Sequence, residues 1–260
     1  MLQEYLGICI VLPAFIGLLG TLLAGRVPPR LQSPAILAVT LTALLLSSFF
    51  LLGKNIHNPE RHWHWLPAIG LFAAFAGGFG FRQESPWWQR LVGSIAVGSL
   101  TGWLLVPTWK DLADQRWLII FSLGLGTMAF TLLTDWLSRT ARPLFILFCF
   151  GLAAFLGAAW VGAGFSLTNA RYLLLLGATI VGILLAAMLP MWLPRFNRSC
   201  MLPLLCSWLL GSLFIGAIEP NPPRFDILLL ALLPLALLAT ANWLRMVLRR
   251  PTEQVPDARM

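Results

Sequence analysis

The stretch MLPLLCSWLLGSLFIGAI, residues 201–218, carries no charged side chain and is the kind of segment that decides this fold. An α-helix rises about 1.5 Å per residue, so roughly 20 apolar residues cross the ~30 Å hydrocarbon core of a bilayer. Nine windows of this kind follow one another along the chain, and 65–81 and 201–218 are the shortest of them. The windows are 6–25, 34–53, 65–81, 86–107, 117–137, 143–165, 170–193, 201–218 and 226–248.

The composition points the same way. Of the 260 residues, 58% are apolar and only 11% are charged, whereas soluble domains carry about twice that charged fraction. The loops between windows are too short for a soluble domain. The sequence therefore predicts an all-α polytopic transmembrane helical bundle of nine spans, forming a single integral membrane domain over residues 1–260 that ends in a short tail at 249–260.

Prolines mark the expected boundaries of several windows. Proline is tolerated in the first turn of a helix because its missing N–H would have no partner there. Five windows have such a proline: Pro34, Pro67, Pro86, Pro143 and Pro203. We expect Ser33 and Ser85 to cap the helices that begin at the prolines after them. Pro13 and Pro234 lie well inside their windows, where we expect bends.

Basic residues divide unequally between the two ends of the windows. One side has six bases and six acids, whereas the other has twelve bases and four acids. Since Lys and Arg collect in cytoplasmic loops, we expect the N-terminus outside, the C-terminus inside, and a bacterial-type cytoplasmic (inner) membrane. The basic side would attract anionic lipid headgroups rather than nucleic acid. The arginines expected there are Arg26, Arg30, Arg139, Arg142, Arg195, Arg198, Arg249 and Arg250.

Small residues recur every fourth position in several windows. Such stripes let helix backbones approach closely inside a membrane. The expected packing residues are Ser94, Gly98 and Gly102, then Ala154, Ala158 and Gly162, then Ala178, Gly182 and Ala186. We favour packing within the bundle, and a glycine-lined solute path or a subunit interface is the alternative. On the path hypothesis, bulky side chains at Gly98 or Gly182 would block transport without unfolding the protein.

Ionisable residues fall in loops or near the ends of the windows. Asp135 is among the deepest, and we expect it to pair with Arg139 one turn later. Proton coupling has no obvious carrier, because no acid lies at the centre of a window. Hydroxyls within the windows either line a mildly polar route or bond a carbonyl of their own helix, and we favour the second for most of them. These are Thr40, Thr42, Ser47, Ser48, Ser99, Thr101, Thr127, Thr131 and Thr179.

The segment KNIHNPERHWHW, residues 54–65, contains all three histidines of the chain. In an extended segment His62 and His64 would project to one side, and His57 or Glu60 could complete a zinc or copper site. Tryptophan beside histidine just before a span also suits the membrane interface, where amphipathic rings settle. We favour the interfacial interpretation, with a metal site at His57, His62 and His64, or pH sensing, as the alternatives.

No catalytic motif is evident. The histidines share one loop, the four cysteines form no C-x-x-C pair, and HNPERH does not match the H-E-x-x-H motif. We therefore expect a protein that works without catalysis and without a cofactor, as a small permease-like protein or as a membrane-embedded subunit. Its partners would be anionic lipids and a membrane protein or a second copy. The alternatives are an enzyme acting on lipid headgroups through its arginine loops and a metal-binding membrane protein.

Overall fold

The computed structural model describes residues 7–52, 62–81, 84–106, 115–164, 167–189, 199–219 and 223–248. All regular structure in these ranges is helical. The nine α-helices there are α2 (Leu12–Ala24), α3 (Pro29–Leu52), α4 (Leu66–Gly80), α5 (Trp87–Leu105), α6 (Arg116–Ser138), α7 (Pro143–Gly164), α8 (Leu167–Met188), α9 (Leu202–Ile218) and α10 (Leu232–Leu248). Each predicted window corresponds to one of them.

Short helical segments lead into four of these helices. The π-helical η1 (Gly7–Val11) precedes α2, and the 3-10 segments η3 (His62–Trp65), η5 (Ser199–Met201) and η6 (Phe225–Ala231) precede α4, α9 and α10. Pro13 and Pro234 lie just after two of these junctions. A proline cannot donate the hydrogen bond of a regular α-helix, so the helix type changes next to both residues where the sequence predicted bends.

Seven helical segments are long and apolar enough to cross a membrane. They are Gly7–Ala24, Pro29–Leu51, Arg116–Ser138, Pro143–Ala163, Ala170–Met188, Ser199–Ile218 and Phe225–Leu248. The remaining two helices are α4, a shorter apolar helix of 15 residues, and α5. The prediction of an all-helical chain suited to a membrane is thus confirmed for the described ranges, whereas nine crossings stay a prediction.

The proline boundaries are met at α4, α7 and α9, and α5 begins at Trp87, one residue after Pro86. The prediction that the second helix begins at Pro34 is wrong, because α3 begins at Pro29 and contains Pro34 in its interior. Pro29 itself can occupy the first helical position. The Gln32 side chain also donates hydrogen bonds to the carbonyls of Val27 (3.1 Å) and Gly25 (3.4 Å), which ties the new first turn to the preceding loop.

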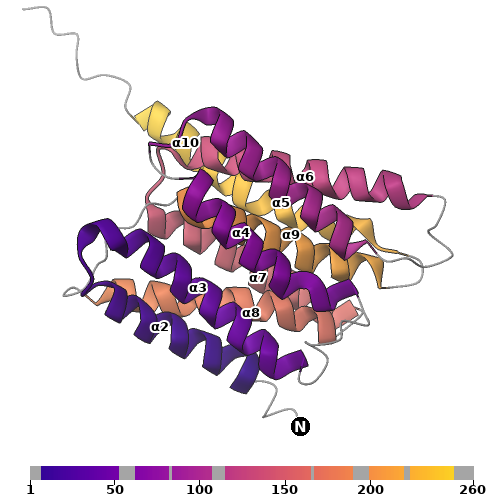
Figure 1. Ribbon diagram of the computed structural model, residues 1–260, viewed down its shortest axis with the longest axis horizontal. Helices are drawn as coiled ribbons and strands as arrows, with labels where there is room; N and C mark the ends of the chain where they lie inside the picture. Colours follow the sequence, from indigo (N-terminus) through magenta and orange to yellow (C-terminus); the bar gives the residue numbers. More distant parts are fainter. Residues whose placement is uncertain are drawn as a thin grey trace, which may run out of the picture.

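The helices run roughly along one common direction (Figure 1). On one flank α2 and α3 lie side by side against α8, and on the other flank α5 packs along α6. The helix α9 runs between these groups and contacts α4, α5, α6, α7 and α8. All 17 residues of α9 are buried, so the opening stretch of sequence forms the centre of the bundle.

The tryptophan in this central helix is a packing residue. Trp208 is fully buried, and its indole Nε1 donates a hydrogen bond of 3.0 Å to the Tyr172 carbonyl on α8. A Cβ atom built at Gly70 of α4 would lie 2.8 Å from the Trp208 ring. The absence of a side chain at Gly70 therefore makes room for the indole.

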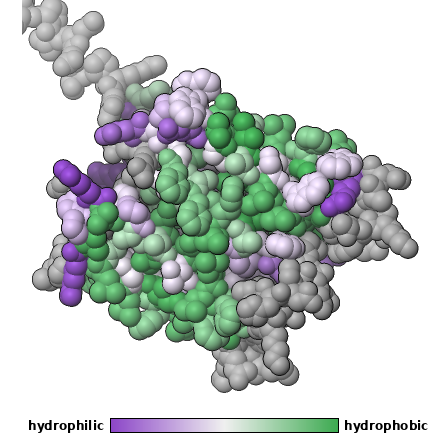
Figure 2. Space-filling model, viewed as in Figure 1, coloured by the Kyte–Doolittle hydropathy of each residue, from purple (hydrophilic) through white to green (hydrophobic). Residues whose placement is uncertain are grey.

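The outer surface is apolar across the middle. Exposed large side chains include Phe15 on α2, Phe121 on α6 and Trp243 on α10. In the space-filling view, green apolar residues cover the middle of the visible face, and purple hydrophilic residues gather toward its two ends (Figure 2). An apolar band between polar ends matches the hydrocarbon layer of a bilayer between its headgroup regions.

Contacts between helix ends show which ends lie together. The Cys200 thiol in η5, just before α9, approaches the Ser33 carbonyl, and a Cβ at Gly77, near the end of α4, would overlap the Cys200 carbonyl. A Cβ at Gly80 would lie 3.2 Å from the Gln89 carbonyl at the start of α5. The charge count assigns all of these ends to the basic side. Their orientation across a membrane stays a prediction.

Candidate functional site

A buried ion pair joins α5 and α6 at this same end. Arg90 lies in the first turn of α5 and Asp135 in the last turn of α6. Their Nη1 and Oδ2 atoms are 2.6 Å apart, and the two side chains are only 12% and 3% exposed. Arg139 approaches the same oxygen at 3.7 Å, with its side chain 58% exposed. Arg90 is therefore the main partner, and Arg139 adds a weaker, solvent-screened interaction.

Close packing of the two helices brings these charges together. A Cβ atom at Gly98 would overlap the Gly124 carbonyl, and a Cβ at Gly102 would overlap the Ile120 carbonyl. The helices can approach only because these positions lack side chains. The start of α5 then meets the end of α6. The Ser94 hydroxyl donates a 2.8 Å hydrogen bond to the Arg90 carbonyl within this first part of α5.

Polar groups of α6 and α9 surround the buried carboxylate. The hydroxyls of Thr134 and Ser138 are buried and donate to carbonyls of their own helix, Phe130 at 2.7 Å and Asp135 at 2.9 Å. The Cys206 thiol on α9 is also buried. The second carboxylate oxygen, Asp135 Oδ1, is buried without a hydrogen-bond partner in the described part of the chain. Asp135 thus depends on Arg90 for most of its compensation.

The sequence predicted the Asp135–Arg139 pair but missed Arg90. Both arginines are on the side to which the charge count assigns Asp135. Arg90 is 45 positions from Asp135 and can pair with it only when α5 and α6 are rotated about their axes so that the two side chains face each other. The spacing of residues within one helix does not reveal that rotation. The predicted pairing of Asp135 with Arg139 is confirmed, at 3.7 Å, but the closer partner, Arg90, was not predicted. The stronger contact crosses between helices.

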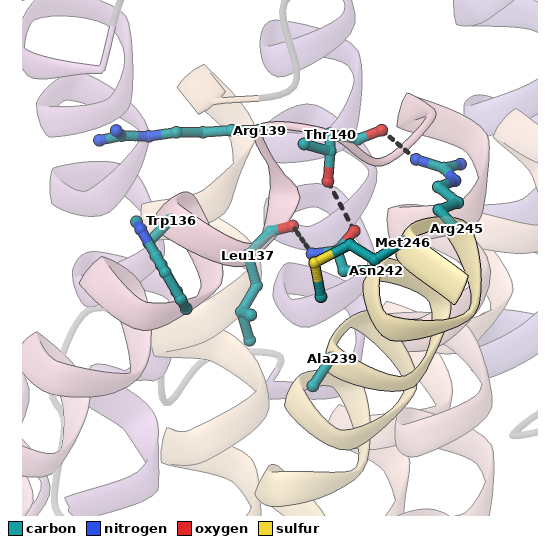
Figure 3. Close-up of a pocket in the computed structure, with 8 residues that line it drawn as sticks. All are labelled: Trp136, Leu137, Arg139, Thr140, Ala239, Asn242, Arg245 and Met246. Carbon is teal, nitrogen blue, oxygen red and sulfur yellow. Dashed lines mark hydrogen bonds between the residues drawn. The ribbon is translucent and has the colours of Figure 1, made fainter. Parts of the chain in front are cut away.

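A pocket of about 700 Å³ lies beside the ion pair, between the last turns of α6 and α10. It is lined by Trp136, Leu137, Arg139, Thr140, Ala239, Asn242, Arg245 and Met246. In the close-up, the Asn242 side chain points from α10 into the turn that follows α6, and Arg139 extends away above Trp136 (Figure 3). The pocket has the size of typical small-molecule sites, about 300–1,000 Å³.

Three hydrogen bonds hold α10 against this turn (Figure 3). The Asn242 Nδ2 donates to the Leu137 carbonyl at 2.8 Å, and the Asn242 Oδ1 accepts from the Thr140 hydroxyl at 2.6 Å. The Arg245 guanidinium donates to the Thr140 carbonyl. The carbonyls of Leu137 and Thr140 lack the next turn of helix that would satisfy them, so side chains of α10 take that place.

One residue in the sequence partly indicates this arrangement. Asn242 is the one amide inside the predicted windows away from their edges, and such a polar group in a membrane helix needs a partner. Neither the identity of that partner nor the pocket followed from the pattern of α10 alone.

The predicted headgroup arginines are spread around this end of the bundle. Arg26 and Arg30 are exposed around the α2–α3 turn, Arg142 is exposed just before α7, and Arg139 lines the pocket. The other four predicted positions lie outside the described residues: Arg195, Arg198, Arg249 and Arg250. The structure therefore brings only one of the eight to a cavity that it describes, beside Arg245.

The small-residue stripes face neighbouring helices. Besides Gly98 and Gly102, a Cβ at Gly182 of α8 would overlap the Ala14 carbonyl of α2. Ser94, Ala154, Ala158, Ala178 and Ala186 are buried, and Gly162 is half-buried. A side chain at Gly98 or Gly182 would thus press against the backbone of the neighbouring helix, and the expectation that bulky variants block transport while staying folded remains a prediction. Gly124 and Gly17 face the stripes on α5 and α8, and neither was predicted as a packing residue.

Most of the mid-span hydroxyls donate a hydrogen bond to a backbone carbonyl of their own helix. Thr40, Thr101, Thr127, Thr131 and Thr179 each donate to the carbonyl four residues earlier, at 2.7–2.9 Å. The preferred interpretation is confirmed for these five. Thr42 and Ser99 are exposed. Ser47 and Ser48 are buried, and neither hydroxyl has a hydrogen-bond partner among the described residues.

The predicted histidine site lies mostly outside the described part. His57 falls in an undescribed segment, the side chain of His62 is not described either, and His64 is partly buried in η3. Within the described ranges, no group of three or more His, Cys, Asp or Glu side chains is placed to hold a metal ion. A metal site at this loop stays a prediction. The four cysteines are buried free thiols: Cys9, Cys149, Cys200 and Cys206.

Comparisons of this chain with protein-family models, with curated proteins and with solved structures find no match.

Proposed function

We propose that this chain is a non-catalytic, membrane-embedded subunit of a larger assembly in a bacterial-type cytoplasmic membrane. It would cross the membrane nine times, with its C-terminus in the cytoplasm. The observation that carries the proposal is the filled centre of the bundle, where every residue of α9 is buried. A solute carrier normally keeps a binding site near the middle of the membrane. In this chain the described pocket lies at one end of the helices instead.

Site-specific crosslinking in cells tests the subunit hypothesis. A photo-reactive amino acid would replace Phe15 on α2, Phe121 on α6 or Trp243 on α10, side chains that are 57%, 72% and 58% exposed. A fixed partner should crosslink from one flank and give one defined product, whereas the other flanks meet only lipid. No protein crosslink from any flank, combined with solute flux in liposomes that contain the purified protein, would contradict the hypothesis.

A small permease is the second candidate, and buried hydroxyls favour it. Thr21 on α2, Ser47 and Ser48 on α3, and Ser212 on α9 have buried hydroxyls without hydrogen-bond partners among the described residues. Unpaired polar groups are costly inside a membrane protein, and a passing solute or water would satisfy them.

Serine substitutions separate the two candidates. On the permease hypothesis, Ser47→Ala and Ser48→Ala lower flux in liposomes while the protein remains folded. Thr42→Ala is the matched control, because Thr42 is exposed on the same helix. If liposomes with the wild-type protein are no leakier than empty ones for a panel of small neutral solutes, the permease candidate fails.

A further inference from the structure

We propose that the pocket between α6 and α10 binds the phosphate headgroup of an anionic glycerophospholipid, with an acyl chain following the apolar part of the same pocket. This inference goes beyond the proposed function and does not depend on it, because a subunit or a permease could each hold such a lipid.

The charges around the pocket favour an anion. Arg139 and Arg245 line it, and no acidic residue is among its lining residues. Among the described residues, Asp135 precedes the lining residue Trp136, and Arg90 pairs with its carboxylate at 2.6 Å. The formal charges of Arg90, Asp135 and Arg139 sum to +1, and Arg245 adds a second positive charge. A phosphodiester supplies the opposite charge and several strong acceptor oxygens.

The donors lie on both sides of the turn after α6. Arg139 and Arg245 extend from α6 and α10 on either side of Thr140 (Figure 3). Arg245 uses one N–H for the Thr140 carbonyl, and a guanidinium has five N–H donors in a planar fork. The side chain of Arg139 is 58% exposed, so its fork can reach a ligand at the mouth of the pocket. Each guanidinium can bind a phosphate oxygen pair through two parallel N–H donors.

The apolar lining favours a lipid over free phosphate. Leu137, Ala239 and Met246 contribute hydrocarbon, and Trp136 adds an indole that is 63% exposed. Only 22% of the apolar window that contains α10 is buried, so the pocket opens on the flank of the bundle, where acyl chains would lie. Tryptophan next to arginine at the end of a membrane helix is typical of the headgroup level.

Native mass spectrometry of the full-length protein in a mild non-ionic detergent tests the proposal. Phosphatidylglycerol and phosphatidylcholine with identical acyl chains would be titrated in parallel. We expect one phosphatidylglycerol to bind about tenfold more tightly than phosphatidylcholine. Arg139→Gln should weaken phosphatidylglycerol binding about fivefold, the scale of one basic residue at an anionic surface, and leave phosphatidylcholine binding nearly unchanged.

Two further variants make the result specific. Arg142→Gln removes the same charge three residues later, from an exposed position outside the pocket lining, and should change phosphatidylglycerol affinity less than twofold. Ala239→Trp fills the apolar part from an exposed position on α10 and should weaken both lipids. Thermal unfolding of each variant shows whether it is folded. If Arg139→Gln does not fold, the loss of lipid binding in Ala239→Trp becomes the deciding measurement.

Three outcomes would overturn the proposal. Equal affinity for the two lipids would show that charge does not select the ligand. An equal loss in Arg142→Gln and Arg139→Gln would show diffuse surface attraction rather than a site. Displacement of phosphatidylglycerol by equimolar inorganic phosphate would show that a soluble anion is the ligand.

Discussion

Asp135 is the only buried acidic side chain in the ranges that the structure describes, and its environment explains why it is tolerated there. A carboxylate taken out of water is costly unless an opposite charge meets it at short range. Arg90 does this at 2.6 Å, whereas Arg139 stands at 3.7 Å and is mostly exposed. At this scale one interhelical contact decides whether the end of α6 can pack against α5.

The first prediction separates the two arginines. Arg90→Gln leaves a buried carboxylate without its closest partner and should lower the free energy of unfolding by about 3 kcal/mol. Arg139→Gln should cost less than about 1 kcal/mol, because that pair is screened. Arg90→Gln combined with Asp135→Asn should recover most of the loss, because no unpaired charge then remains. Unfolding by a denaturing detergent in mixed micelles measures all three, and equal losses for the two arginine variants would contradict the assignment.

Helix pairs are held by backbone contact at glycines rather than by large side chains. Lipid tails are as apolar as leucine, so burial alone gives little drive for helices to associate in a membrane. At Gly182 a Cβ would overlap the Ala14 carbonyl and lie 2.9 Å from the Leu18 nitrogen. In contrast, a Cβ at Gly126 of α6 has nothing within 4 Å. The two glycines therefore differ in role although both lie inside apolar helices.

The second prediction uses this difference. Gly182→Ala forces α2 and α8 apart and should cost about 2 kcal/mol, within the range for overpacked cores. Gly126→Ala adds the same methyl group in open space and should change stability by less than about 1 kcal/mol. Unfolding midpoints in one detergent give the comparison, and a loss at Gly126 as large as that at Gly182 would refute the contact argument.

The third prediction concerns α10, the most exposed of the long helices. Asn242→Ala removes one hydrogen bond to the last turn of α6 and one to the turn after it, and should speed amide exchange in α10 and in that turn several-fold. The cost to global stability should be about 1 kcal/mol, since such bonds are individually weak in membrane proteins. Thr240→Ala is the control, because the Thr240 hydroxyl bonds only the Ala236 carbonyl of its own helix at 2.8 Å. Unchanged exchange in Asn242→Ala would show that α10 is held in another way.

The whole molecule has two chemically different ends. At the end that contains the pocket, the described residues include Arg26, Arg30, Arg90, Arg139, Arg142 and Arg245, with Glu84 and Asp135 as acids. At the opposite end, the described charges are Arg116, Arg171 and Arg224, with Glu219 and Asp226. The arginine excess persists in the three-dimensional arrangement of these helix ends, which supports one orientation over the reverse.

The fourth prediction tests that orientation. A single cysteine introduced at Arg30 or Arg142 should react with a membrane-impermeant thiol reagent only after the cells are opened. A cysteine at Arg224 should react in intact cells. The four native thiols are buried and serve as the unreactive background. Labelling of all three positions from the same side would contradict an odd number of crossings between 142 and 224.

A structural feature could be predicted from the sequence when it depends on residues close together in the chain, and not when it depends on contacts between distant residues. The windows around 201–218 and 226–248 were found because apolar runs and their flanking charges are local features. The start of α3 at Pro29 was missed because Pro29 and Pro34 each suit a first turn, and the Gln32 contacts chose between them. For the candidate site, the sequence pattern identified Asn242 and Arg139 as residues of interest, but it did not predict the pocket that both of them line.

By itself the sequence determined that the chain forms apolar helices suited to a membrane, where nearly every helix lies, and which helix ends collect positive charge. These properties follow from hydropathy, proline chemistry and charge, each of which acts within a few turns of one segment. Only the tertiary structure decided that α9 is the centre, that Arg90 lies closer to Asp135 than Arg139 does, and that α6 and α10 enclose a pocket. Those outcomes depend on the rotation and separation of helices far apart in the sequence, which many weak backbone contacts set together.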